Sequence, residues 1–346
     1  MRFAFQLLAL ITLISPLPVL ATESAVILMY HRFDEQRYPA TNIRADQLRQ
    51  HLDYLKANNF AVLPLAEVLT KLRKGESLTE KTVVITIDDA YNSVYETAFP
   101  LFKEYGYPFS VFVSVGPIDN GLRGFMTWNQ MREMQSSGVA FFNHGTSHDY
   151  LIRMLPGESN NQWQARIHKD IENAQHRLEE ELNIQARLFA YPYGEYNEAL
   201  RALVMDLGYT AFGQHSGAAG SYSDLGALPR FPINEAFGEI NGFIDKVNSL
   251  ALPVANATPL DPVIKTANPP ILKLELVGKK RLKLALSCFS TGNAPMQIQR
   301  EKNLLIVQSL KPMPKGRSRY NCTAPSGERG RYYWYSHLWI LDSGSR

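Results

Sequence analysis

Residues 82–89 read TVVITIDD, a β-branched apolar run that ends in the acidic pair Asp88 and Asp89. Because β-branched side chains favour strands, the run before the two aspartates is predicted to be a buried strand. Apolar side chains then recur at helical spacing over residues 94–105, and Gly106 follows them. This pattern is typical of an amphipathic helix that ends at a glycine. The stretch therefore predicts a strand and a helix, with two carboxylates at the carboxyl end of the strand.

The same alternation of short apolar runs and amphipathic stretches extends from about residue 24 to residue 250. It predicts parallel strands with helices packed outside them, as in a barrel or an open doubly wound sheet. In either architecture the active-site residues lie at the carboxyl ends of the strands. The expected strands are residues 25–30, 82–87, 109–115, 139–143, 187–191, 209–213 and 228–233, and the expected helices are residues 46–58, 94–105, 127–137, 163–182 and 197–207.

The two ends of the chain differ from this pattern. Residues 1–21 combine a positive start, an apolar run and small residues near the end, which is the anatomy of a secretory signal peptide, so we expect export to the periplasm or beyond. Residues 251–270 are rich in proline and lack periodicity, which predicts a linker between a main domain (22–250) and a small β-rich module (271–346). The strand-like runs of this module are residues 271–277, 281–288, 303–307 and 330–340.

Charge and cysteine content limit the possible partners. The net charge is only +3 and no basic cluster stands out, which argues against nucleic acid as a partner. After the first 21 residues no apolar stretch is long enough to span a membrane. We also expect the protein to be a monomer. Cys288 and Cys322 both lie in the last quarter of the chain. In an exported protein this favours a disulfide, with two buried free thiols as the alternative.

His144 and His148 follow the expected strand 139–143. If the chain is helical there, their spacing places both imidazoles on one face, which suits a shared metal ion. Considered separately, such a histidine pair can arise by chance, and an aspartate pair before a helix is most often a cap. Their common placement after strands favours a joint site with Asp88 and Asp89.

A turn, Tyr191-Pro192-Tyr193-Gly194, follows the next expected strand. A Pro-containing turn usually needs no functional explanation. This one can also direct the N–H of Tyr193 into a cleft, where it would act as an oxyanion donor.

Taken in order, these residues resemble a known family. Thr86-Ile87-Asp88-Asp89, Asn143-His144-Gly145-Thr146-Ser147-His148 and Tyr191-Pro192-Tyr193-Gly194 resemble the first three motifs of the polysaccharide deacetylases (the NodB-homology family, carbohydrate esterase family 4). Met29-Tyr30-His31 also resembles the branch that includes periplasmic deacetylases of poly-N-acetylglucosamine. The likeness covers about residues 25–235 and implies a distorted (β/α) barrel.

The resemblance also implies a role for each matching residue. Asp89, His144 and His148 would bind a divalent metal, usually Zn²⁺, and Asp88 would be the general base. The N–H of Tyr193 would help to stabilise the oxyanion. The implied reaction is the hydrolysis of N-acetyl groups on an envelope or extracellular polysaccharide, with release of acetate.

The chain departs from the family pattern at two points. Many members carry an arginine where this chain has Ala190, and that arginine pairs with the base carboxylate. Arg230, at a later strand end, could reach the same place or could be a solvated loop cation. The late Leu-x-His motif that supplies the general acid is not visible after residue 232. We assign the role of general acid to His215. His31 is expected to contact either the substrate or one of the residues that bind the metal.

Other functions are compatible with these residues. A non-catalytic glycan-binding protein on the same fold would explain the two departures, but a pure binder has no need of the base Asp88. An O-acetyl esterase and an amidase for small cyclic amides are further alternatives, and the expected export makes the amidase less suitable. In the C-terminal module, residues 332–339 are aromatic on both faces of an expected strand, which indicates either a buried strand or a carbohydrate-binding platform.

Overall fold

Strand β7 (Thr82–Asp88) is buried along its whole length and lies between β2 (Ser24–Tyr30) and β8 (Ser110–Val113). Both neighbours run parallel to it. The computed structural model describes residues 21–277 and 285–341. Residues 1–20 of the predicted signal peptide and part of the expected run 281–288 lie outside the described residues.

The main sheet has the strand order β11-β10-β9-β8-β7-β2-β12 and is parallel from β11 to β2. Its two sides are joined by residues 228–232. Leu228 forms a parallel bridge with Phe212 in β11, while β13 (Phe231–Pro232) pairs in parallel with β2. This segment closes the sheet, so the predicted distorted (β/α) barrel is confirmed. The remaining strands of this part are β1 (Ala21–Thr22), β3 (Arg32–Phe33), β4 (Asn42–Ile43), β5 (Ala61–Val62), β6 (Leu78–Thr79), β9 (Ala140–Asn143), β10 (Leu188–Ala190), β11 (Thr210–Phe212) and β12 (Ala219–Gly220).

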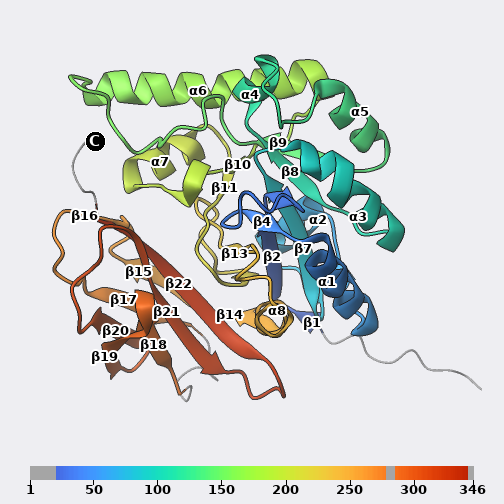
Figure 1. The fold of residues 1–346 in the computed structure, drawn as a ribbon. Helices are drawn as coiled ribbons and strands as arrows, with labels where there is room; N and C mark the ends of the chain where they lie inside the picture. Colours follow the sequence, from blue (N-terminus) through green and yellow to red (C-terminus); the bar gives the residue numbers. More distant parts are fainter. Residues whose placement is uncertain (1–20, 278–284, 342–346) are drawn as a thin grey trace, which may run out of the picture.

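Helices cover the outside of the barrel strands (Figure 1). They are α1 (Ala45–Ala57), α2 (Leu65–Lys74), η1 (Val94–Ala98), α3 (Phe99–Tyr105), α4 (Val115–Asp119), α5 (Trp128–Ser136), α6 (Asn160–Leu182), η2 (Pro192–Gly194), α7 (Glu198–Asp206) and α8 (Ile240–Val247). All five expected helices are present, and α2, α4 and α8 are additional. In the part of the chain that the structure describes, no helix has the length and apolar character needed to cross a membrane.

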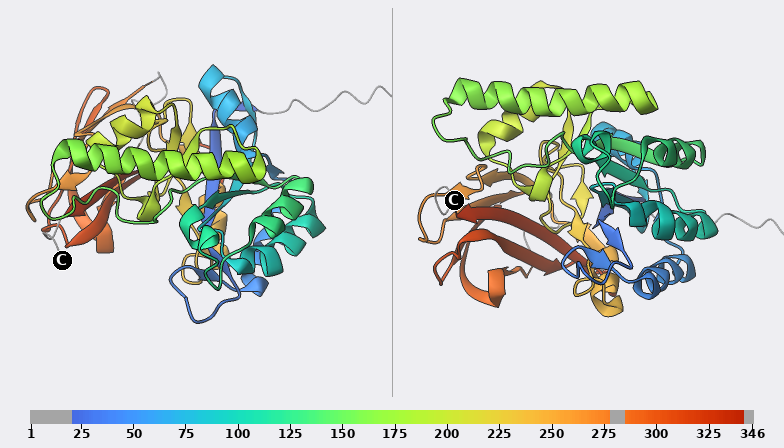
Figure 2. Two further views of the ribbon diagram at one scale, coloured as in Figure 1. Left: turned by 90° about the horizontal axis from the view of Figure 1, so that it is seen from above. Right: turned by 45° about the horizontal axis from the view of Figure 1, so that its top comes forward.

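The C-terminal part forms a second sheet with the order β14-β22-β21-β18-β19-β20-β17-β15, and β16 pairs with β22. Figures 1 and 2 show this sheet beside the barrel, on the side away from α3 and α5. Its strands are β14 (Ser249–Ala251), β15 (Val254–Thr258), β16 (Val263–Ile264), β17 (Leu272–Leu276), β18 (Ser287–Ser290), β19 (Ala294–Glu301), β20 (Leu304–Ser309), β21 (Gly316–Pro325) and β22 (Tyr332–Leu341), with the short turn η4 (Thr291–Asn293).

The predicted linker, residues 251–270, is part of this second sheet. It contains β15 and β16, and β15 pairs with β17 in an antiparallel register. Most side chains of β15 are exposed or partly exposed, so an apolar alternation is missing although the backbone is hydrogen-bonded. The sequence did not predict these strands, because an edge strand of this kind carries no periodic signal.

A disulfide joins Cys288 and Cys322 with an S–S distance of 2.05 Å. The two residues are direct neighbours in the antiparallel pair β18–β21. The predicted disulfide is therefore confirmed, and it connects two adjacent strands of the second sheet.

Strand β22 is buried between the barrel and the rest of the second sheet. Trp334 meets Phe231 of the barrel edge-on, with ring centroids 5.2 Å apart. Trp339, on the other face, packs in the core of the second sheet. The first residue, Tyr332, is 48% exposed, whereas the strand from Ser336 to Leu341 is buried. Of the two interpretations of this aromatic segment, the structure favours the buried strand.

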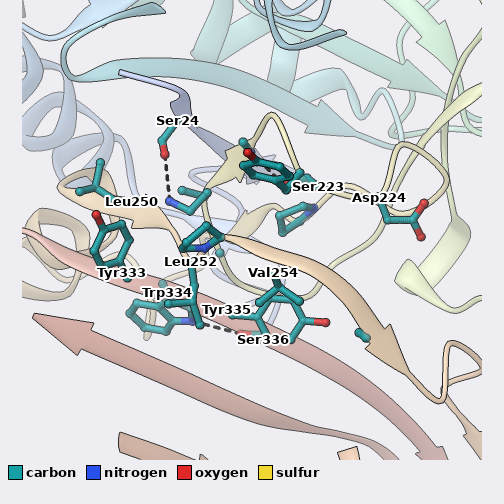
Figure 3. A pocket seen from close by; sticks show the side chains of 18 of the residues that line it. Ser24, Ser223, Asp224, Leu250, Leu252, Val254, Tyr333, Trp334, Tyr335 and Ser336 are labelled. Atoms are coloured by element: carbon teal, nitrogen blue, oxygen red, sulfur yellow. Dashed lines mark hydrogen bonds between the residues drawn. The ribbon is translucent and has the colours of Figure 1, made fainter. Parts of the chain in front are cut away.

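The barrel and the second sheet also enclose a pocket of about 900 Å³. The residues that line it include Leu250 and Leu252 and, from β22, Tyr333, Trp334 and Tyr335 (Figure 3). The N–H of Ala251 donates a hydrogen bond of 3.0 Å to Ser24 Oγ, at the start of β2. The two sheets are thus in direct contact and no free linker separates them.

Candidate active site

The residues singled out in the sequence meet at one end of the barrel. Asp88 and Asp89 lie at the end of β7, and His144 follows β9. The turn η2 follows β10, the next strand in the sheet. Because these strands are parallel neighbours, their carboxyl ends share one rim, and side chains distant in sequence come within contact distance.

Asp89, His144 and His148 form a compact group. Their ligand atoms all lie within 4.8 Å of one another, and Nε2 of His144 and Nε2 of His148 are 3.2 Å and 2.9 Å from Asp89 Oδ1. Burial acts to raise the pKa of Asp89, but the two neighbouring imidazoles outweigh it and hold the pKa well below its usual value. The group is therefore ready to offer one carboxylate oxygen and two nitrogens.

The two histidines are brought together by a loop and not by a helix. Residues 144–150 have no regular secondary structure, and Gly145 and His148 have positive φ values of 80° and 55°. Helix α6 holds this loop through Asp170, whose carboxylate accepts hydrogen bonds from the N–H groups of Thr146 and Ser147 at 3.0 Å and 2.9 Å. The helical i, i+4 geometry considered for this pair is therefore not the one found. Asp170 was missed because nothing in the sequence distinguishes it from other acidic residues of α6.

The imidazole of His144 is held in place by a hydrogen bond to the backbone. Its Nδ1 lies 2.7 Å from the carbonyl oxygen of Ala190 and donates to it, which leaves Nε2 as a lone-pair donor. Both His144 Nε2 and Asp89 Oδ1 are buried without a hydrogen-bond partner of good geometry. Buried polar atoms of this kind normally have a partner. Nitrogen and carboxylate donors at a shared point fit a divalent ion such as Zn²⁺.

Arg230 forms a bidentate ion pair with Asp88. Its Nη1 and Nη2 donate to Asp88 Oδ1 and Oδ2 at 2.7 Å and 2.8 Å, and both side chains have an exposed fraction of 0%. The Arg230 Nε donates to the carbonyl oxygen of Gly213 at 3.0 Å. Burial alone would raise the pKa of Asp88, but Arg230 outweighs it and lowers the pKa below its usual value. Asp88 is thus held as an oriented carboxylate beside the Asp89–His144–His148 group.

His31 and His215 occupy different surroundings. Burial lowers the pKa of His31, and the charges that act on it include Asp89, Asp88 and Arg230. Burial lowers the pKa of His215 to about 4, and the acidic group that acts on it is Asp224. His215 lines the pocket between the barrel and the second sheet. His31 thus follows the strand next to the one that ends in Asp88, whereas His215 lines the pocket between the two sheets.

Tyr193 lines the same end of the barrel. Its ring centroid lies 4.7 Å from that of His148 and 4.0 Å from that of Tyr150, on which it stacks. Its backbone has the left-handed values φ 58° and ψ 3°. The Tyr193 carbonyl oxygen accepts a short hydrogen bond from Arg317 of β21. Sequence reasoning missed Tyr150 and Arg317, because neither lies at a strand end of the barrel.

Comparison with known proteins gives a consistent result. Residues 75–212 match the family model of the polysaccharide deacetylases. The chain is 27% identical over 209 residues to YxkH of Bacillus subtilis (strain 168), over 60% of this chain and 71% of that protein. It is also 27% identical over 233 residues to the poly-beta-1,6-N-acetyl-D-glucosamine N-deacetylase of Escherichia coli (strain K12). That match covers 58% of this chain and only 34% of the relative.

Two solved structures resemble the barrel. The Streptococcus pyogenes deacetylase PplD in complex with acetate is 25% identical, with a TM-score of 0.58 over 65% of this chain and 98% of that chain. IcaB from Ammonifex degensii is 26% identical, with a TM-score of 0.56 over 62% of this chain and 94% of that chain. Both likenesses leave about a third of this chain unmatched, as the uncovered shares of 35% and 38% show.

The barrel of this chain is therefore similar in fold to these two deacetylases. The chain contains a domain of the polysaccharide deacetylase family, and the resemblance read from the sequence is confirmed. The match to this family supports a hydrolase that acts on amide bonds.

Proposed function

We propose that the protein is an exported, metal-dependent deacetylase that hydrolyses N-acetyl groups of an envelope or extracellular polysaccharide and releases acetate. The observation that carries this proposal is the joint geometry of two groups. Asp89, His144 and His148 converge on one point, and the Asp88–Arg230 ion pair lies next to them. A chain that only bound glycan would have no use for an oriented, ionised carboxylate beside a metal site.

Asp89, His144 and His148 would hold the ion. When bound, a divalent ion such as Zn²⁺ lowers the pKa of its water to about 7 and polarises a carbonyl oxygen. Asp88 is the proposed base and takes the proton on a carboxylate oxygen. Each of its oxygens keeps a lone pair beyond the one used by Arg230, so the ion pair orients the base without blocking it.

We assign protonation of the leaving amine to His31 in place of His215. The reason is position, since Tyr30 pairs with Ile87 and His31 therefore follows the strand beside the one that ends in Asp88, whereas His215 lines the pocket between the two sheets. A general acid must reach the reacting atoms directly or through one water. The N–H of Tyr193 is the proposed oxyanion donor, because its ring lies against His148 at the same rim.

The first polymer to test is poly-β-1,6-N-acetyl-D-glucosamine, the substrate in the names of several relatives. Acetate release is measured across a glycan panel for the wild type, Asp88→Asn and His144→Ala, with and without a chelator. We expect turnover by the wild type alone, and its loss on chelation. Turnover that survives both substitutions would overturn the mechanism, and a metal-loaded protein without turnover would favour a glycan-binding function. An O-acetylated glycan in the panel tests the esterase alternative.

A further inference from the structure

Arg317 of β21 reaches from the second sheet to the barrel turn that follows β10. Its Nη1 donates to the carbonyl oxygen of Tyr193 and, at 3.3 Å, to Gln214 Oε1. Its Nε lies 3.7 Å from Glu195 Oε1. Ile340, the direct neighbour of Arg317 in the β21–β22 pair, packs in a core cluster of the barrel. The strand that carries Arg317 is therefore fixed against the barrel.

The residue that Arg317 contacts has an unusual backbone conformation. Tyr193 has φ 58°, in the left-handed region that non-glycine residues rarely occupy, so its surroundings must maintain it. The next residue, Gly194, has φ 67°, and a Cβ at this position would lie 2.4 Å from the Gln214 side chain. The turn thus packs tightly on Gln214, and Arg317 contacts both Tyr193 and Gln214.

The side chain of Tyr193 passes this constraint to a proposed metal ligand. Its ring is tilted by 61° against the His148 ring at a centroid distance of 4.7 Å. The Tyr193 ring also stacks on the ring of Tyr150, with a centroid distance of 4.0 Å. The Arg153 guanidinium carbon lies 3.7 Å from the centroid of the Tyr150 ring. His148 lies in a loop without regular secondary structure and its side chain is 23% exposed, so packing against Tyr193 limits the rotation of its imidazole.

We propose that Arg317 is a positioning residue of the active site, which holds Tyr193 and through it the imidazole of His148. The second sheet then belongs to the catalytic unit and is not an appended module. This inference rests on the proposed metal site and on the proposed deacetylase activity. It follows from the general rule that groups behind a metal ligand set the ligand's orientation and hence the metal affinity.

Arg319 supplies a matched control. It lies two residues further along β21 and also contacts the barrel, through a hydrogen bond of 3.1 Å from its Nη1 to Ser216 Oγ. If Arg317 only attached the two sheets to each other, Arg317→Gln and Arg319→Gln would have similar effects. A positioning role predicts that only the change at Arg317 reaches the metal site.

The experiment uses the full chain as wild type, Arg317→Gln, Arg317→Lys and Arg319→Gln. Melting temperature reports folding, Zn²⁺ affinity is measured by competition with a chelator, and kcat and KM are measured by acetate release. For Arg317→Gln we expect Zn²⁺ binding weaker by about 10-fold and kcat lower by about the same factor. Arg317→Lys should recover part of both, and Arg319→Gln should bind Zn²⁺ like the wild type.

The outcomes separate this inference from the proposed function. Equal Zn²⁺ affinities in the wild type and Arg317→Gln would overturn the positioning role, even if both are active. Equal losses in the two glutamine variants would also overturn it, because they would indicate a general interface effect. A wild type that binds Zn²⁺ but releases no acetate would overturn the proposed function alone, provided that Arg317→Gln still weakens Zn²⁺ binding.

Discussion

Arg230 and Asp88 are 142 residues apart in sequence and form a bidentate ion pair with no solvent exposure on either side chain. The pair joins the segment that closes the barrel to the strand that carries the proposed base. A charge pair in such a place is costly to break, since removing one partner leaves the other charge buried and alone. This relationship gives the first of five predictions.

Arg230→Gln should lower the free energy of unfolding by about 3–5 kcal/mol, because Asp88 would lose the buried counter-charge with which it forms a bidentate pair. Urea unfolding at neutral pH measures the loss. The control is Arg49→Gln, which breaks a surface pair with Glu104 whose side chains are 46% and 54% exposed. That change should cost less than about 1 kcal/mol. Equal losses in the two variants would contradict the importance of the buried pair.

Zn²⁺ should stabilise the wild type but not His144→Ala. A ligand that binds only the folded state stabilises it by about 2.7 kcal/mol at a concentration of 100 times Kd. Thermal unfolding with and without Zn²⁺ gives the shift. His176→Ala is the control, since this histidine of α6 is 69% exposed and pairs with Glu180. A metal-induced shift that persists in His144→Ala would exclude this residue as a ligand.

His31→Gln should lower kcat by about 100-fold or more, the usual contribution of a general acid. His215→Gln should leave kcat near the wild-type value, because His215 lies beside the pocket between the two sheets and not beside the aspartates. Acetate release by both variants, each checked for Zn²⁺ binding, decides between them. The reverse pattern would restore His215 as the acid.

The protein should lose stability in mild acid. Burial lowers the pKa of His215 to about 4 and the pKa of His337 to about 3, from the ordinary value of 6.5. Below that ordinary value the unfolded chain binds protons that the folded chain does not bind. The contribution of these histidines is therefore complete above pH 6.5 and decreases as the pH falls towards 4. Urea unfolding between these limits should show a shallower decline for His337→Gln, and an unchanged slope would argue against its burial as the cause.

Removal of residues 249–346 should prevent folding of the barrel. If β22 formed a carbohydrate-binding platform, deletion of residues 255–346 would weaken polymer binding and spare the turnover of short oligomers. The structure argues against that expectation, because Leu338 and Ile340 of β22 are part of the barrel's own core cluster. Soluble yield and circular dichroism of the truncated chain test this, and a folded, active barrel would contradict it.

The sequence was informative wherever a local pattern determines the local structure. Buried parallel strands are continuous apolar runs, so β2, β7 and β8 and the polar residues after the barrel strands could be predicted before the structure was known. Edge strands such as β15, with mostly exposed side chains, have no such pattern. Their existence depends on backbone pairing with β17, which is a tertiary contact.

The candidate site also contains residues that a local sequence pattern identifies and residues that only tertiary contacts identify. The strand-end rule identified Asp88, Asp89 and His144, because each directly follows a predictable strand. It could not distinguish His31 from His215, since both follow strands and only the course of the chain beyond the strand decides which way each faces. Arg317 was beyond reach for another reason, because it comes from a different sheet, 124 residues after Tyr193.

The closing segment of the barrel has a consequence for the order of events during folding. Residues 228–232 bridge β11 and β2, and the same five-residue segment carries Arg230 to Asp88. A partly folded chain in which this segment has not yet docked therefore has an open barrel and also an unpaired, unoriented base. Catalytic competence should therefore appear only once residues 228–232 have docked, so a chain with an open barrel is an inactive one.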